Sequence, residues 1–176
     1  MTEPKPSSAT HHHRRDAVAQ VAAVVVTVSD TRTLGTDTGG NLLAELLVEA
    51  GHVVVERVIV PDEPAAIERV VREALVREDV RAVLLTGGTG VAPRDVTPET
   101  VAPLLERVVP GFGELFRMLS YEDIGSAALL SRAMAGIAAG KVVFVLPGSR
   151  GAIRLALEKL ILPELGHLAA EAVKTR

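Results

Sequence analysis

Continuous apolar runs, separated by segments of helical periodicity, constrain the fold of this chain more than any other feature. The runs cover residues 21–28, 53–60 and 82–85, and Glu56 and Arg57 interrupt the second of them. Uninterrupted apolar strands are typical of the interior of a parallel sheet. Between them, apolar side chains recur every three or four residues over residues 41–50 and from residue 64 onward. Strands joined by helices predict an α/β fold, a three-layer α/β/α domain with a mostly parallel sheet and right-handed crossovers.

The second half of the chain departs from this alternation. Three helices are expected in succession, over residues 98–105, 113–120 and 127–132. A further strand is expected at residues 142–146, with residues 135–138 paired to it as a hairpin. The last helix is expected to begin with Ser149 as its N-cap.

The length of 176 residues fits one domain. We expect residues 1–16 to form a flexible arm, because they offer little to pack, and residues 17–176 to form the domain. The run from His11 to His13 could hold a transition metal. Adjacent histidines on a mobile arm preset no coordination geometry, so a solvated tail is the favoured interpretation.

Composition excludes several classes of function. A formal net charge of -3 provides no overall basic field for nucleic acid. The chain has no cysteine, which excludes disulfides and thiolate metal sites and is compatible with a reducing cytoplasm. The start of the chain lacks an apolar signal core, and no run is long enough to span a bilayer. We therefore expect a cytoplasmic protein with no membrane partner.

A glycine-rich turn follows the third apolar run, in the order Thr86, Gly87, Gly88, Thr89 and Gly90. Glycines can take positive φ and carry no Cβ, so backbone N–H groups can turn inward toward a phosphate, and the threonines add hydroxyl donors. Further on, Thr97 reads as the N-cap of a helix, with Pro98 and Glu99 in its first turn. This pattern predicts an anion site, and the alternative is a tight connection between strand and helix. The turn matches neither a P-loop nor a dinucleotide fingerprint.

A second turn, Pro147-Gly148-Ser149, also joins a strand end to a helix start. It would present backbone N–H groups and a hydroxyl at the same edge of the sheet. From this motif alone, an ordinary N-cap is the simpler interpretation.

Two acids, Asp62 and Asp95, lie just past strand ends on the presumed ligand edge. Carboxylates near a phosphate site make sense when Mg²⁺ lies between them and the phosphates. As alternatives, Asp62 could be a turn residue after Pro61, and Asp95 could pair with Arg94 on the surface.

The loop after the first strand carries Ser29, Asp30 and Asp37 at the same edge. A nucleotide-side role for this loop is one interpretation. The other is that Asp30 and Asp37 cap or turn the loop.

The segment from Thr86 to Glu99 closely resembles the signature of the MoaB/Mog family of molybdenum cofactor biosynthesis proteins. The resemblance runs from about residue 21 to about residue 168, and residues 112–136 look more like the MoaB branch than the Mog branch. Further matching motifs are Val28-Ser29-Asp30-Thr31-Arg32, Asp37-Thr38-Gly39-Gly40, Val60-Pro61-Asp62-Glu63, residues 111–120, Ser131-Arg132-Ala133 and Leu146-Pro147-Gly148-Ser149.

The resemblance implies molybdopterin adenylylation with Mg-ATP as co-substrate, giving adenylyl-molybdopterin and pyrophosphate. It assigns molybdopterin to the residue 86–90 and residue 147–149 loops, and it matches Asp62 and Asp95 to aspartates implicated in adenylyl transfer. The pattern from Arg94 to Glu99 is intact, which favours activity. The alternatives are a non-catalytic molybdopterin carrier and molybdate insertion, and the latter would require further domains.

One expected helix carries more apolar side chains than a single face packed on one core would require. These are Phe112, Leu115, Phe116, Met118 and Leu119. We expect this cluster to pack a subunit interface. The resemblance implies a homo-oligomer, either a trimer or a hexamer, and names the molybdate-insertion protein as a further partner.

Overall fold

The structure is a computed structural model and describes residues 18–174. One sheet has the strand order β2-β1-β3-β6-β5-β4. Its strands are β1 (Ala22–Val28), β2 (Val53–Val60), β3 (Ala82–Thr86), β4 (Arg107–Val108), β5 (Met134–Ala138) and β6 (Lys141–Leu146). β1, β2, β3 and β6 run parallel, whereas β5 is antiparallel to both of its neighbours. The mostly parallel sheet is confirmed.

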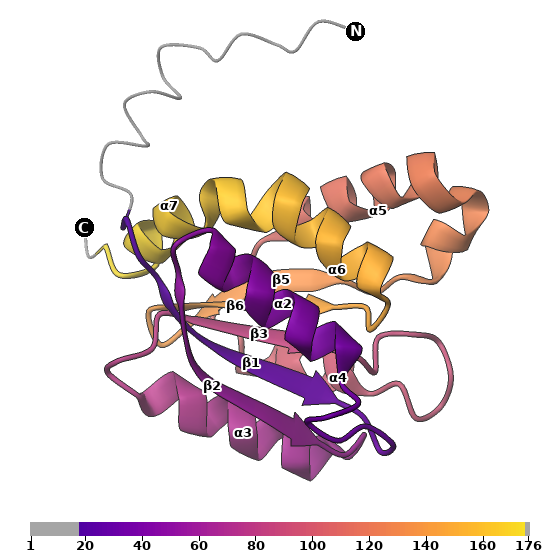
Figure 1. Cartoon of the computed structure of the whole chain (residues 1–176), viewed down its shortest axis with the longest axis horizontal. Helices are drawn as coiled ribbons and strands as arrows, with labels where there is room; N and C mark the ends of the chain where they lie inside the picture. Colours follow the sequence, from indigo (N-terminus) through magenta and orange to yellow (C-terminus); the bar gives the residue numbers. More distant parts are fainter. Residues whose placement is uncertain (1–17, 175–176) are drawn as a thin grey trace, which may run out of the picture.

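Helices cover both faces of this sheet (Figure 1). On one face lie α2 (Thr38–Glu49), α5 (Pro110–Ile124), α6 (Arg150–Ala156), the π-helical segment η4 (Leu157–Ile161) and α7 (Leu162–Ala172). On the other face lie α3 (Pro64–Val76) and α4 (Thr97–Val101). Each face has its own apolar core, so the three-layer α/β/α arrangement is confirmed.

The uninterrupted apolar runs correspond to middle strands of the sheet, whereas residues 53–60 form the edge strand β2. Every residue of β3 and of β6 is buried, because helices cover these strands on both sides. The hairpin of β5 and β6 is also confirmed, and its turn places Ala139 and Gly140 at φ values of 47° and 68°. Strand β4 was not predicted, since two exposed residues are too short for periodicity to detect.

Two of the expected helices differ in type, and the first of them also differs in its start. Residues 98–105 form the short α4 and then a 3₁₀ turn, η2 (Ala102–Leu104), which contains Pro103. Residues 127–132 were expected as a helix, and the structure has the 3₁₀ segment η3 (Gly125–Leu130) instead. The prediction that Thr97 is an N-cap is wrong by one residue: Val96 occupies that position, and Thr97 is the first residue of α4.

The apolar cluster of α5 divides between two environments. Phe112 and Phe116 are buried in the core, where Phe112 packs edge-on against Phe144 with ring centroids 5.3 Å apart. Leu115 and Met118 are exposed, at 47% and 54%. The two phenylalanines therefore do not belong to an outer interface, and only the outward-facing part of the cluster is open to a partner.

Two further predictions concern the N-terminal arm and the membrane. The N-terminal arm and the run from His11 to His13 lie outside the described residues. Among residues 18–174, no helix has both the length and the apolar composition needed to cross a membrane.

Candidate functional site

Four loops meet at the carboxyl edge of the parallel strands. The register pairs Val28 with Val60, Thr27 with Thr86, and Thr86 with Leu146, so the strands end side by side. Each predicted site residue lies at one of these strand ends or in the loop that follows it. The structure therefore brings together groups that are up to about 120 positions apart in the chain, at the edge where parallel α/β sheets bind ligands.

Two of these loops are tied to each other. The Gly87 N–H donates to the Leu146 carbonyl at 3.1 Å, and the Thr86 hydroxyl donates to the Pro147 carbonyl at 3.0 Å. The Thr86 side chain is buried, with 1% exposure. Its hydroxyl hydrogen is used in the bond that joins the two turns. The hydroxyl oxygen can therefore only accept a hydrogen bond from a ligand.

Glycine is required by geometry at two positions of the glycine-rich turn. Gly87 and Gly88 have φ values of 104° and 61°, as the sequence indicated. A Cβ on Gly87 would lie 2.3 Å from the Val28 carbonyl oxygen. Gly90 does not take positive φ; its small size admits the Asp95 carboxylate, which would lie 2.7 Å from a Cβ at that position.

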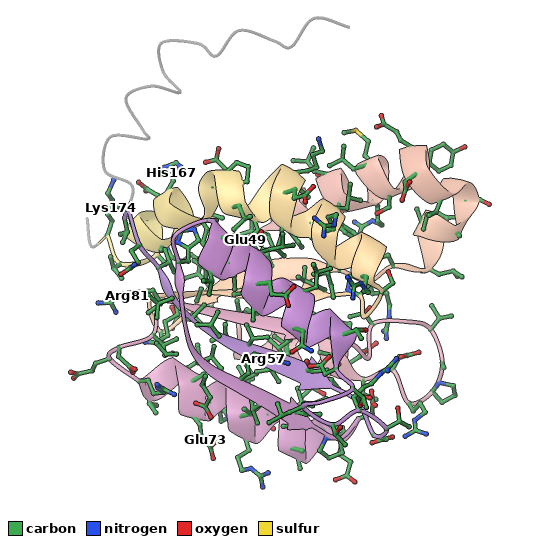
Figure 2. The ribbon with its side chains drawn as sticks, in the orientation of Figure 1. Glu49, Arg57, Glu73, Arg81, His167 and Lys174 are labelled. Carbon is green, nitrogen blue, oxygen red and sulfur yellow. The ribbon has the colours of Figure 1, made fainter. Side chains whose placement is uncertain are left out.

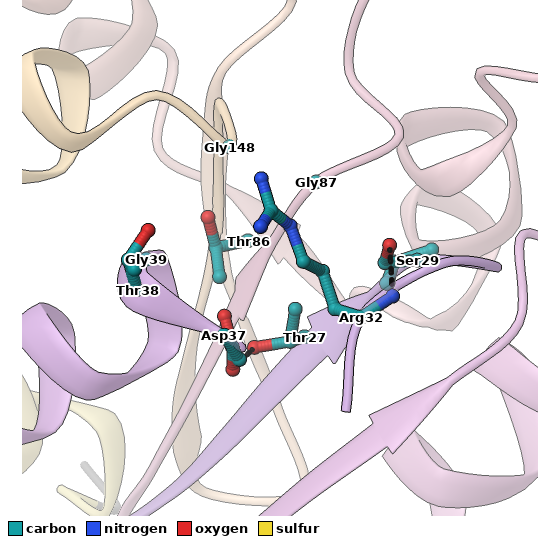
Figure 3. Close-up of a pocket in the computed structure, with 10 residues that line it drawn as sticks. Thr27, Ser29, Arg32, Asp37, Thr38, Gly39, Thr86, Gly87 and Gly148 are labelled. Carbon is teal, nitrogen blue, oxygen red and sulfur yellow. Dashed lines mark hydrogen bonds between the residues drawn. The ribbon is translucent and has the colours of Figure 1, made fainter. Parts of the chain in front are cut away.

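A cavity of about 120 Å³ lies between the ends of β1, β3 and β6 and the start of α2 (Figure 3). Four predicted site residues line it: Ser29, Thr86, Gly87 and Gly148. The lining that was not assigned to the site from sequence includes Thr27, Arg32 and Thr38. Arg32 and Thr38 stand in motifs that carry the family resemblance, which was the signal available for finding them.

The cavity is suited to an anion. Arg32 lines it and donates to the Thr36 carbonyl at 3.1 Å, which directs its side chain along the loop (Figure 3). The start of α2 also faces it, and its backbone N–H groups carry partial positive charge. Arginine and a helix start together favour a phosphate group.

Asp37 is held inside the protein. Its carboxylate caps α2 by accepting from the Gly40 N–H at 2.8 Å, and it also accepts from the Thr27 hydroxyl at 2.7 Å. Arg57 reaches from the edge strand β2 to this carboxylate at 3.2 Å (Figure 2). The capping interpretation of Asp37 is thus confirmed, and Arg57 balances its charge beside the cavity.

Asp62 and Asp95 lie together beside the glycine-rich turn. Burial and the charge of Asp95 both raise the pKa of Asp62, which places the two carboxylates within electrostatic reach. A Cβ on Gly88 would lie 3.0 Å from Asp62 Oδ1. Asp95 Oδ2 accepts from the Ala92 N–H at 2.9 Å, so the loop itself orients this acid. Asp95 does not pair with Arg94, whose partner is Asp30.

Asp30 connects three loops. One oxygen accepts from the Asp62 N–H at 3.0 Å, and the other pairs with Arg94. Each oxygen therefore already has one partner in the protein, and a nucleotide contact through Asp30 would use a remaining lone pair. Next to it, Ser29 Oγ accepts from the Arg32 N–H at 3.3 Å, which shapes the wall of the cavity.

Two hydroxyls differ in what they offer a ligand. Ser149 caps α6 by accepting from the Ala152 N–H at 3.3 Å, a bond that leaves its own hydrogen free to donate. Thr97 Oγ1 is buried and has no hydrogen-bond partner among residues 18–174. A Cβ on Gly88 would lie 2.3 Å from this oxygen, so the orphaned hydroxyl abuts the glycine-rich turn next to Asp62.

The acids fit a cation that arrives with its own oxygen ligands. Within residues 18–174, no three His, Cys, Asp or Glu side chains gather as a preformed metal cage. Mg²⁺ commonly takes one or two carboxylates and completes its shell with phosphate oxygens and water. Asp62 and Asp95 match that requirement.

Fold and site define an α/β domain of the class that binds ligands at the carboxyl edge of parallel strands. A model of the family described as "Probable molybdopterin binding domain" matches residues 24–167. "Molybdenum cofactor biosynthesis protein B" of Bacillus anthracis is 56% identical over 160 residues, which is 90% of this chain and 95% of that protein. The chain belongs to the MoaB/Mog family of molybdenum cofactor biosynthesis proteins.

Solved structures agree with this assignment. The tungsten cofactor synthesizing protein MoaB from Pyrococcus furiosus has a TM-score of 0.81 at 39% identity, covering 90% of this chain and 100% of that one. The Mog protein from Mycobacterium ulcerans has a TM-score of 0.79 at 27% identity, covering 87% and 99%. The higher identities to MoaB proteins confirm the predicted branch.

Proposed function

We propose that this protein transfers the adenylyl group of Mg-ATP to molybdopterin, giving adenylyl-molybdopterin and pyrophosphate. The observation that carries the proposal is the Asp62 and Asp95 pair, which lies against the same glycine-rich turn that borders the anion cavity. A protein that only held a phosphorylated pterin would gain nothing from two repelling acids at that turn. When a nucleotide arrives with Mg²⁺, the two carboxylates can bind the metal ion and so attract the nucleotide instead of repelling it.

The two halves of the site suit two substrates. We assign molybdopterin to the cavity side, where residues 86–90 and residues 147–149 meet Arg32 and the start of α2. We assign the Mg-nucleotide to the side of Asp62 and Asp95, next to the loop of Ser29 and Asp30. Placing the phosphate of one substrate near the α-phosphate of the other is the main requirement of the reaction.

The reaction needs no protein nucleophile. An oxygen of the terminal phosphate of molybdopterin attacks the α-phosphorus of ATP, and a new P–O–P bond forms. The bond from that phosphorus to the oxygen bridging to the β-phosphate breaks, and pyrophosphate leaves with the electron pair. The magnesium of the nucleotide offsets charge on the departing pyrophosphate. Arg32 and the backbone N–H groups at the start of α2 would hold the attacking phosphate and offset its charge.

The test uses ATP labelled at the α-phosphorus, incubated with the protein, molybdopterin and Mg²⁺. The proposal predicts label in the pterin and release of unlabelled pyrophosphate in equal amount. Label that stays in ATP while molybdopterin remains bound would establish the carrier instead. Release of AMP from adenylyl-molybdopterin only when molybdate is added would point to the insertion step.

We also propose that the outer face of α5 packs against other copies of the chain. Leu115 and Met118 are exposed there, and several large apolar side chains continue the surface. These are Tyr121, Ile124, Leu129 and Leu130, with exposures from 56% to 80%. Such a contiguous apolar surface is typical of an oligomer interface, here that of a trimer or hexamer. The product would then pass to a molybdate-insertion protein.

A further inference from the structure

Arg132 contacts the glycine-rich loop from a distant part of the chain. It lies between η3 and β5, and its guanidinium makes three contacts with the segment that runs from β3 into α4. Nε donates to the Thr89 carbonyl at 3.3 Å, and Nη2 donates to the Asp95 carbonyl at 2.6 Å. Nη1 pairs with the Glu99 carboxylate in α4.

These contacts tie together both ends of a loop that has little regular structure. Residues 87–96 connect β3 to α4 without a helix or strand of their own. Ordering such a segment costs conformational entropy for each residue. The hydrogen bonds of a planar guanidinium, which has five donors in a fixed geometry, offset that cost by holding two carbonyls at a set separation. A lysine ammonium cannot reproduce this geometry.

The held segment includes the acid assigned to the reaction. Arg132 holds the Asp95 carbonyl while the carboxylate of the same residue accepts from the Ala92 N–H. The placement of the Asp95 carboxylate beside Gly90 thus depends on backbone that Arg132 holds. Arg132 is not part of the cavity lining on the molybdopterin side.

We propose that Arg132 is a positioning residue for the nucleotide half of the site: it holds residues 87–96 in the conformation that places the Asp95 carboxylate beside the glycine-rich turn. This inference rests on the proposed adenylyl transfer for its effect on turnover. Its effect on the loop itself does not depend on that function. Arg132 acts through the backbone of the glycine-rich loop and touches neither substrate.

The experiment compares Arg132→Gln and Arg132→Lys with a matched control, Arg77→Gln. Arg77 follows α3 and pairs with Glu56 at 2.5 Å and with Asp79 at 2.8 Å. It lies before the start of β3, whereas the glycine-rich loop follows the other end of that strand, so its loss removes an arginine and two ion pairs away from the loop. Four properties are measured in each full-length variant: amide hydrogen exchange of residues 87–96, steady-state kinetics for Mg-ATP, the Kd for Mg-ATP, and the Kd for molybdopterin.

We expect faster exchange of the loop amides in Arg132→Gln, together with a loss of about a hundredfold in kcat/KM for Mg-ATP, the scale of a misplacement near 1 Å. The molybdopterin side of the loop is held separately, because Thr86 and Gly87 donate hydrogen bonds to the Pro147 and Leu146 carbonyls. The Kd for molybdopterin should therefore change by less than about threefold, which a general loss of structure would not allow. Arg132→Lys should recover only part of the rate, and Arg77→Gln should match the wild type.

Unchanged loop exchange in Arg132→Gln would overturn the inference, whatever the activity of the wild type. An equal loss of molybdopterin and Mg-ATP affinity would also overturn it, because the role would then be general stability. If the wild type forms no adenylyl-molybdopterin but Arg132→Gln still loosens the loop and weakens Mg-ATP binding, the proposed function fails and the positioning role stands.

Discussion

The carboxylate of Asp30 accepts a hydrogen bond from the backbone N–H of Asp62 across 3.0 Å, joining residues that follow two neighbouring strands. Because the other oxygen of Asp30 pairs with Arg94, this one side chain links the Asp62 loop to the glycine-rich loop. Removing it should disturb the acid pair without touching the cavity lining.

We predict that Asp30→Ala lowers adenylyl transfer at least tenfold and destabilises the fold by about 1 kcal/mol, the usual worth of a partly exposed hydrogen bond. Asp30→Asn is the matched control, since its amide oxygen can still accept from the Asp62 N–H. Turnover assays and urea unfolding measure the two effects. Equal damage from both variants would mean that the pairing with Arg94, and not the hydrogen bond to Asp62, is what counts.

Gly87 should be intolerant of any side chain. Its φ of 104° disfavours other residues, and a Cβ would lie 2.3 Å from the backbone oxygen of Val28, which cannot rotate away. Gly87→Ala should therefore cost about 2 to 4 kcal/mol of unfolding free energy. Gly111→Ala provides the control, because a Cβ there meets nothing within 4 Å and α5 should tolerate it. Similar midpoints for the two variants in urea unfolding would refute this prediction.

His52 should make stability depend on pH. Burial lowers the pKa of His52 below 6.5, and its Nδ1 accepts from the Val21 N–H at 3.2 Å, a bond that protonation of Nδ1 would remove. Below pH 6.5 the unfolded chain therefore binds the proton more readily, and this contribution to stability falls as the pH drops toward the folded pKa. One proton gives a slope of at most about 1.4 kcal/mol per pH unit.

The measurement is urea unfolding of the wild type and His52→Asn between pH 7.5 and pH 5. Asparagine can keep an acceptor near the Nδ1 position but does not titrate. The wild type should lose more stability on acidification than the variant does. Parallel curves would show that His52 is not responsible.

The outer face of α5 should control assembly. Met118 is 54% exposed, so Met118→Glu should leave the fold of one chain nearly unchanged but place a charge in the proposed apolar contact. Light scattering should show the trimer or hexamer of the wild type and smaller species for the variant. Val76→Glu, at an exposed position in α3, controls for added charge. A wild type that is a stable monomer would contradict the interface.

Sequence patterns predicted the elements that are long and buried. The predictions of β1, β3 and β6 were correct because helices cover both faces of these strands, which makes their sequences apolar. The predicted start of α6 was correct because Ser149 is its N-cap. The misses are local. The two-residue strand β4 has no period, and the 3₁₀ turns η2 and η3 have too few residues to be separated from a helix by spacing.

The site was predictable where a residue sits at a strand end, and much less so where side chains from several loops cooperate. The place of Asp62, Asp95 and the glycine-rich turn at the carboxyl edge followed from their positions after strands, and their roles in binding and catalysis stay predictions. Two hydrogen bonds join residues tens of positions apart: Thr86 donates to the Pro147 carbonyl, and Arg132 donates to the Asp95 carbonyl. The spacing of residues in the sequence does not predict such contacts. The sequence also did not show which residues of α5 belong to the core, because it does not indicate which of two apolar helix faces packs against Phe144.

The most direct measurement of the central claim is chromatographic detection of adenylyl-molybdopterin after incubation with molybdopterin, ATP and Mg²⁺. Wild type is compared with Asp95→Asn and with Asp79→Asn, which removes an exposed acid paired with Arg77 outside the site. The account predicts product from the wild type and Asp79→Asn, at least about a hundredfold less from Asp95→Asn, and molybdopterin bound by all three. Equal product from Asp95→Asn, or no product from a wild type that binds molybdopterin, would contradict it.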